Sequence, residues 1–175
     1  MEDLQYPIGR FNSPEVITDV QLKGYIDDIR HLPNLLEIAV QGLDAWQLET
    51  PYRPGGWTIQ QVVHHLVDSH TNAITRFKWA LTEDAPLIKA YDEAAWAELP
   101  DVQHTPVNVS VTILYGLHTR WVHLMEHLTP AQWERTFIHP ESGKTFGLKT
   151  VAGNYAWHGM HHLAHIVNLK EREGW

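Results

Sequence analysis

The last amphipathic segment of this 175-residue chain, residues 150–173, reads TVAGNYAWHGMHHLAHIVNLKERE. Successive residues of a helix lie about 100° apart around its axis, and this rotation gathers one apolar face: Val151, Tyr155, Ile166 and Leu169. His158 and His162 fall on the same face. Their offset of four stacks the two imidazoles one turn apart, where nitrogens of both rings can reach a single metal ion.

A second helix is predicted over residues 58–81. Thr58 followed by Gln61 forms a capping box, and Trp57 just ahead of it is a candidate hydrophobic staple. His65 lies on this helix in a polar stripe that borders an apolar arc; the stripe also holds Ser69, Asn72 and Arg76. A polar stripe at the edge of a core is what the wall of a hydrated pocket needs.

Two more helices are predicted. The first opens at Ser13-Pro14 or at Thr18 and runs to about residue 43, and Pro33 is expected to kink or restart it. Its expected apolar face includes Val20, Tyr25, Ile26, Ile29, Leu32, Leu35, Leu36 and Ile38. The other helix spans about residues 109–128, with an apolar face that includes Ile113, Leu114, Leu117, Trp121, Leu124, Met125 and Leu128.

The connections complete the fold prediction. Residues 1–13 read as an extended arm, and residues 83–108, with three prolines, read as a long and mostly irregular crossover loop. A second capping box at Thr129 predicts a short helix. Residues 136–148 predict a small hairpin. We therefore expect an all-α protein, a four-helix bundle with a long crossover loop and a small hairpin before the last helix, forming one domain over residues 1–175.

Composition excludes several classes of protein. The formal net charge is −8 and no stripe of Lys or Arg reverses it locally, so nucleic acid is not an expected partner. No apolar run approaches the roughly 20 residues that cross a bilayer, and the acidic N-terminus does not resemble a signal peptide. Cysteine is absent, so the chain has neither disulfides nor a thiol nucleophile. A cytoplasmic location is expected.

The chain has 13 histidines, and the helical wheel sorts those outside the His65, His158 and His162 set. His161 and His165 point toward the polar edge of the last helix, and His64 points well away from His65. His70 falls inside the apolar arc and could be core or ligand. His118 is favoured as a hydrogen-bonded core or supporting histidine over a fourth ligand.

Spacing alone leaves two readings open for the histidines. A metal site and a set of two or three satisfied core histidines fit the pattern equally well. Asp92 and Glu93 in the long loop are a candidate general base, although a solvated loop is the favoured interpretation. Arg76 could bind a carboxylate or phosphate of a substrate, and a structural salt bridge fits it at least as well.

The chain also resembles a known family, the YfiT branch of the DinB/YfiT-like superfamily, over essentially its whole length. The residues that carry the resemblance are Tyr6-Pro7-Ile8-Gly9, Tyr52-Arg53, Gly55-Gly56-Trp57-Thr58, Gln61-Val62-Val63-His64-His65-Leu66, Asp68-Ser69-His70, Arg76-Phe77-Lys78, Leu81-Thr82-Glu83, Tyr91-Asp92-Glu93, Trp96, Leu117-His118, Arg120-Trp121, His139-Pro140, Tyr155-Ala156-Trp157-His158, His161-His162, Ala164-His165-Ile166 and Gly174-Trp175.

This resemblance implies a four-helix bundle, usually dimeric, that binds one divalent metal, Zn²⁺ or Ni²⁺, through three histidines. The implied ligands are His65, from the histidine before a leucine, and His158 and His162, from the HxxxH pattern. The implied activity is metal-dependent hydrolysis of a small molecule. The alternative is a thiol transferase that uses bacillithiol or a similar low-molecular-weight thiol as co-substrate.

Three neutral imidazoles leave a metal ion with its full charge and an open position, which is the layout of a catalytic site. Such an ion can activate water for hydrolysis or hold a thiol as thiolate. Two other classes compete with the enzyme: a non-catalytic metal-binding stress protein and a histidine-rich structural bundle. An accessible cleft beside the three histidines would count against the first of these.

Overall fold

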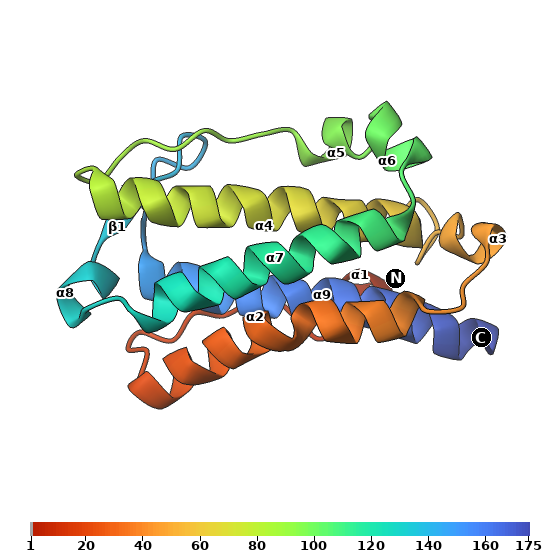
Figure 1. Ribbon diagram of the computed structural model, residues 1–175, viewed down its shortest axis with the longest axis horizontal. Coiled ribbons are helices and arrows are strands. Elements are labelled where there is room, and N and C mark those ends of the chain that lie inside the picture. The colour runs from red at the N-terminus through yellow and green to blue at the C-terminus, as the bar shows by residue number, and fades with distance from the viewer. Residues whose placement is uncertain (1) are drawn as a thin grey trace.

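Four long helices form the body of the protein, and the computed structural model describes residues 2–175. The long helices are α2 (Asp19–Val40), α4 (Ile59–Thr82), α7 (Val107–Glu126) and α9 (Leu148–Glu173). Helix α2 packs mainly against α7 and α9, and α4 packs against the same two helices. In Figure 1, α2 and α9 run in one direction and α4 and α7 in the other, so the crossover between α4 and α7 returns along the length of the bundle.

Shorter elements fill the connections. They are α1 (Glu2–Gln5), α3 (Ala45–Leu48), α5 (Glu93–Trp96), α6 (Pro100–His104), α8 (Pro130–Trp133), β1 (Thr136–Ile138) and β2 (Thr145–Gly147). The two strands form an antiparallel hairpin in which Phe137 faces Phe146. The predicted bundle, crossover and hairpin are therefore confirmed. The arm is not wholly extended, because it begins with α1. The crossover is mostly irregular, as predicted, and carries two short helices, α5 and α6.

Capping boxes set where the helices begin. At α4 the Thr58 hydroxyl accepts from the Gln61 backbone N–H at 3.1 Å, and the Gln61 side chain accepts from the Thr58 N–H at 3.0 Å. The same reciprocal pair at Thr18 and Gln21 starts α2, which settles its start in favour of Thr18. Helix α2 continues through Pro33 without a restart, because the chain stays helical from Asp19 to Val40.

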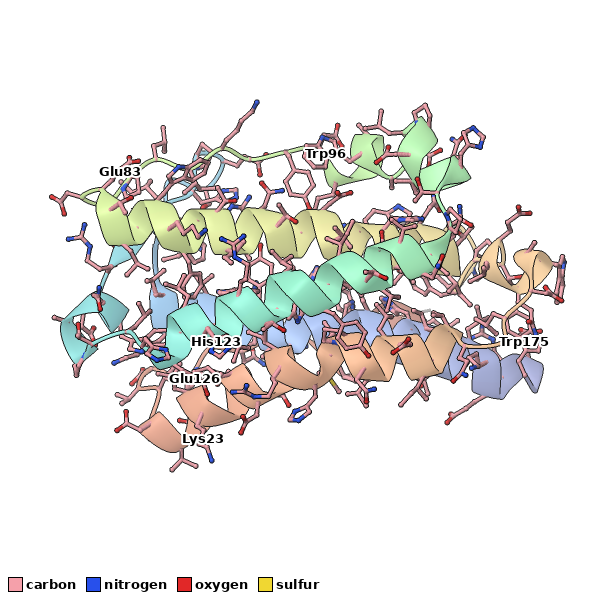
Figure 2. The ribbon with its side chains drawn as sticks, viewed as in Figure 1. Lys23, Glu83, Trp96, His123, Glu126 and Trp175 are labelled. Carbon is pink, nitrogen blue, oxygen red and sulfur yellow. The ribbon has the colours of Figure 1, made fainter. Side chains whose placement is uncertain are left out.

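Several residues predicted on apolar faces are exposed. Val20 is 83% exposed, Ile38 58% and Ile113 47%. Each long helix packs mainly against two others, so only the stripe that faces those two is buried, and the apolar arc of the sequence is wider than that stripe. Figure 2 shows the polar surface at the C-terminal end of α7, where Glu126 lies beside His123. Arg30 of α2 forms an ion pair with Glu126 and donates a hydrogen bond to its carboxylate at 2.6 Å.

A layer of histidines divides the apolar core into two clusters. One cluster includes Ile29, Phe77, Trp121 and Ala152, and the other includes Leu36, Ile59, Leu114 and Ile166. Along α4 the change of cluster falls between Leu66 and Ala73, where His70 lies. Along α7 it falls between Leu114 and Trp121, at His118, and along α9 between Ala156 and Leu163, at His158 and His162. The functional candidates therefore occupy one level of the bundle.

The crossover is fastened along α4 by side chains of that helix. Gln61 donates to the Ala97 carbonyl at 3.1 Å, and Gln60 donates to the Val102 carbonyl at 2.7 Å. Arg76 donates to the Lys89 carbonyl at 3.3 Å. These bonds satisfy backbone groups that the irregular segment cannot pair within itself, and they place residues 89–97 over the middle of α4. No helix of residues 2–175 is both long and apolar enough to cross a membrane.

We predict that Gly159→Ala lowers the free energy of unfolding by about 1–3 kcal/mol, because overpacking a close helix contact strains the core. A Cβ at Gly159 of α9 would lie 2.5 Å from Leu32 Cδ2, and Leu32 is only 2% exposed. Gly116→Ala on α7 is the matched control. Nothing lies within 4 Å of its Cβ position, so alanine there should stabilise the helix by about 0.5–1 kcal/mol. Urea unfolding measures both, and equal effects would contradict the close contact.

Candidate metal centre

Three histidines from two helices converge in the middle of the bundle. His65 of α4 and His158 and His162 of α9 each offer one ring nitrogen, and these three atoms lie within 4.8 Å of one another. The Nε2 atoms of His65 and His158 are 3.2 Å apart. The ring centroids of His158 and His162 are 4.5 Å apart, as their spacing of one helical turn requires.

This geometry fits a divalent metal ion. Imidazole nitrogens bind Zn²⁺ at about 2.0–2.1 Å, so two ligands at a tetrahedral angle place their nitrogens roughly 3.3–3.4 Å apart. The 3.2 Å separation between His65 Nε2 and His158 Nε2 is close to that value. His162 Nδ1 is buried and has no hydrogen-bond partner among the described residues. A buried unpaired nitrogen is costly, and a bound ion would remove that cost at one nitrogen of the ring.

Burial keeps the three candidate ligands neutral. It lowers the pKa of His65 to about 4, and it holds the pKa values of His158 and His162 well below their ordinary value. The neighbouring imidazoles lower the pKa values of His158 and His162 further. At neutral pH each ring therefore has a free lone pair, which is the form that binds metals.

His70 and His118 lie behind His158 and are hydrogen-bonded, not part of the converging set. His70 is fully buried, and its Nε2 lies 3.2 Å from His158 Nδ1. His118 is 1% exposed and lies 2.9 Å from His70 through its Nε2 and 2.5 Å from the Ile29 carbonyl through its Nδ1. His118 is thus a hydrogen-bonded core histidine, as the sequence favoured. His70 is also a core histidine, because both of its ring nitrogens have hydrogen-bond partners.

His161 and His165 were expected at a polar edge, and this prediction is wrong. They are 6% and 3% exposed, because the N-terminal arm and the loop before α4 cover that side of α9. Tyr52 of the loop stacks on His165 with ring centroids 3.8 Å apart, and the Gln5 carbonyl lies 3.1 Å from His165 Nε2. His64 does point away from the centre, toward Ser110 of α7.

A cavity of about 350 Å³ opens beside the three histidines. Aromatic side chains form much of its lining, and Trp57 packs on His65 with ring centroids 4.6 Å apart. Arg53 and Glu93 line the same cavity. An accessible cavity next to the candidate ligands is what an open coordination position needs.

A second cavity, of about 410 Å³, shares His158 and Glu93 with the first. Its lining is more apolar and includes Phe11, Phe137 and Phe146 as well as Arg76. His158 therefore stands where two cavities of different character meet.

Arg76 and Glu93 form the polar side of the second cavity. Arg76 donates to the Tyr155 hydroxyl at 3.2 Å, while its Nε is buried and has no hydrogen-bond partner among residues 2–175. Burial raises the pKa of Glu93, and the nearby Arg76 guanidinium opposes that rise. Sequence reasoning favoured a solvated loop for Asp92 and Glu93. Both residues are indeed exposed. Asp92 caps α5, and Glu93 also lines both cavities, a position that depends on how the crossover is fastened along α4.

We predict that the metal-free protein loses stability as the pH falls from 6.5 toward 4. Above about pH 6.5 the buried histidines are neutral both in the folded protein and in the unfolded chain. Below it the unfolded chain takes up protons, whereas burial lowers the pKa values of His65, His118, His161 and His165 to about 4 in the folded state. Each such group contributes up to about 1.4 kcal/mol per pH unit. Urea unfolding with chelator at pH 7 and pH 5 tests this; equal stabilities would contradict it, and His161→Gln should reduce the slope.

Comparison with known proteins gives the chain a family. Residues 29–166 match the DinB superfamily. Two relatives, from Bacillus mycoides strain KBAB4 and Bacillus thuringiensis subsp. konkukian strain 97-27, are 54% and 53% identical over the whole of both chains, and both are named as candidate metal-dependent hydrolases. YfiT from Bacillus subtilis, described as a probable metal-dependent hydrolase with an unusual four-helix bundle topology, is 44% identical over 99% of each chain with a TM-score of 0.97. The chain therefore belongs to the DinB superfamily and has the YfiT fold.

Proposed function

We propose that this protein is a metal-dependent hydrolase whose metal ion is held by His65, His158 and His162. The observation that carries the proposal is the convergence of three neutral imidazoles, two of them buried and that of His158 half-buried, beside an accessible cavity. A structural metal site has all its positions filled by protein ligands, whereas three ligands and a cavity are typical of a catalytic one. The names of the Bacillus relatives agree with this reading.

Zn²⁺ and Ni²⁺ are the proposed ions, since imidazole suits both and the converging set contains no thiolate or carboxylate among the described residues. When bound, the ion supplies a Lewis acid that polarises a substrate oxygen and acidifies water. The three imidazoles stay neutral, so they leave the whole positive charge of the ion available for that purpose.

Glu93 is the proposed proton acceptor. Glu93 lines both cavities, and in each it shares the lining with His158. Burial raises the pKa of this carboxyl group, which brings its basicity closer to that of a useful general base at neutral pH. In hydrolysis it would take a proton from the attacking water and pass it on to the leaving group.

Arg76 is the proposed anchor for an anionic substrate group. Its guanidinium lies on the wall of the more apolar cavity, and its buried Nε has no protein partner. No carboxylate lies within 4.0 Å of it among the described residues, and its charge favours the ionised form of Glu93. A carboxylate or phosphate oxygen bound there would receive a charge-assisted hydrogen bond.

A second candidate function, thiol transfer, is favoured by one observation: two cavities meet at His158. A transferase must hold a thiol and an electrophile at the same time, and two cavities of different polarity suit two co-substrates. The chain has no cysteine, so the thiol would have to be a small molecule such as bacillithiol. Release of chloride from 1-chloro-2,4-dinitrobenzene only when a low-molecular-weight thiol is added would favour transfer over hydrolysis.

We predict that untagged protein binds one Zn²⁺ or Ni²⁺ per chain and that His65→Ala, His158→Ala and His162→Ala each lose it. Removing one of three ligands leaves two, which is too few to hold the ion against competing water. Elemental analysis measures the metal, and circular dichroism shows whether the helices survive.

His161→Ala is the matched control for these variants. His161 is 6% exposed and lies on α9 with His158 and His162, but it is not one of the three converging histidines. It should keep the metal. Wild-type protein that is metal-free and cannot be loaded with zinc or nickel would overturn the metalloenzyme proposal and leave a histidine-rich bundle.

We predict a kinetic split between Glu93 and Arg76 in the metal-loaded protein. Glu93→Gln should lower kcat by about 10²–10⁴-fold for 4-nitrophenyl acetate, because the amide cannot accept the proton. Arg76→Ala should raise KM by about 10–100-fold for the anionic 4-nitrophenyl succinate and change KM for the neutral ester little. Both variants should retain the metal.

Two surface variants serve as matched controls for this split. Glu134→Gln removes a carboxylate whose partner is Lys149, and Arg30→Ala removes a guanidinium whose partner is Glu126. Neither pair lines the cavities, so neither variant should change kcat or KM. If Arg76→Ala has the same ratio of KM values for the two esters as the wild type, Arg76 does not bind the anionic group of the substrate.

A further inference from the structure

A line of buried and partly buried hydrogen bonds connects the metal centre to the backbone of α2. It runs from the Ile29 carbonyl to His118 Nδ1 at 2.5 Å, from His118 Nε2 to His70 Nδ1 at 2.9 Å, and from His70 Nε2 to His158 Nδ1 at 3.2 Å. His158 Nε2 then faces His65 Nε2 at 3.2 Å. Every ring nitrogen along this line has one partner, so the positions of the protons can be worked out from its fixed end.

The fixed end is a carbonyl oxygen, which can only accept. His118 Nδ1 must therefore carry a proton and donate it to Ile29, which leaves His118 Nε2 as an acceptor in a neutral ring. His70 then donates from Nδ1 to His118 and accepts at Nε2. His158 in turn donates from Nδ1 to His70. The one ring nitrogen left with a bare lone pair is His158 Nε2, which faces the converging ligands.

The rings are held in the orientation that these bonds require. The His70 and His118 rings are parallel, at 0°, and their centroids are 4.9 Å apart while the bonded nitrogens are 2.9 Å apart. The nitrogens therefore face each other edge to edge. Trp121 stands perpendicular to both rings, at 87°, and Tyr155 stands perpendicular to His70, at 90°. These large side chains prevent either imidazole from turning out of the line.

The line cannot serve as a proton path to solvent. It ends at an amide carbonyl, which does not take up a proton at physiological pH, and both His70 and His118 are at most 1% exposed. A role in orientation remains. A histidine that binds a metal through one nitrogen commonly donates from the other, and that second bond sets which nitrogen is free.

We propose that His70 and His118 are positioning residues that hold His158 as the Nδ1-H tautomer. The Ile29 carbonyl, three hydrogen bonds away, fixes this tautomer, and the lone pair of His158 Nε2 is therefore the one that faces the metal. The use of this tautomer rests on the proposed metal site, but the tautomers themselves follow from the fold alone. They should be the same with and without metal, because the carbonyl sets them and the ion does not.

Long-range ¹H–¹⁵N spectra of the histidine rings test this directly in the full chain at pH 7.5. We expect Nδ1-H tautomers for His118, His70 and His158 in the chelator-treated protein, and the same three tautomers after zinc is added. If the metal alone selected the tautomer, His158 would be a mixture of both forms, or mainly Nε2-H, before zinc is added. That result would overturn the proposal.

Three variants separate positioning from packing. His118→Phe leaves His70 without its acceptor and should make the His158 tautomer mixed, with a 10–100-fold loss of zinc affinity. His118→Gln places an amide oxygen where it can accept from His70 and should restore both the tautomer and most of the affinity. His64→Phe is the matched control, because His64 is also buried and doubly hydrogen-bonded, to Ser110 and Thr105, outside this line. It should leave the His158 ring signals unchanged.

The outcomes distinguish this inference from the proposed function. If the wild-type protein shows the expected tautomers but takes up neither zinc nor nickel, the metalloenzyme proposal is overturned and the inference about the histidine line stands. Zinc uptake by a protein whose His158 is the Nε2-H form before loading would keep the enzyme and overturn the line. If His118→Phe does not fold, the wild-type spectra still decide the question.

Discussion

The structure depends on one line of hydrogen bonds that touches all four long helices. Ile29 lies on α2, His118 on α7, His70 on α4 and His158 on α9. The first two links are buried and the third is partly buried, between two apolar clusters. In such a low-dielectric setting an unpaired nitrogen costs about 1–3 kcal/mol, and a helix that slid by one residue would break one link if it were α2 or α9 and two links if it were α4 or α7. The line therefore fixes the register of the helices as well as the centre that it supports.

This polar layer trades stability for chemistry. A bundle with leucine or phenylalanine at these levels would have a continuous apolar core, and such a core is often the more stable choice. The chain instead places five histidines at or beside the level where its two apolar clusters meet: His65, His70, His118, His158 and His162. Three of them converge beside the cavity, and the other two use all their nitrogens to hold one of the three in place.

The sequence predicts what depends on neighbours along the chain. The capping box at Thr58, the inward direction of His158 and His162 and the hairpin after α8 all follow from local spacing, and the structure agrees. It does not predict what depends on distant segments. His161 and His165 are buried by Tyr52 and the arm, and Glu93 reaches the cavities because Gln60, Gln61 and Arg76 fasten the crossover. A helical wheel places Val20 and Ile113 on the apolar face, but it cannot show which helices pack against that face, and both residues are exposed.

The N-terminal arm forms part of the wall of the cavity, which matters for how the protein is purified. The Gln5 carbonyl lies 3.1 Å from His165, the Tyr6 ring lies 5.7 Å from the His161 ring, and the Gly9 carbonyl accepts from Trp157 at 3.2 Å. In Figure 1 both chain ends lie toward the same half of the bundle. A polyhistidine affinity tag at the N-terminus would thus begin a few residues from the cavity and bring six extra imidazoles to its rim. Metal-to-protein ratios measured on such a fusion would report the tag together with the site, so a tag without histidines, or its complete removal, is the sounder preparation.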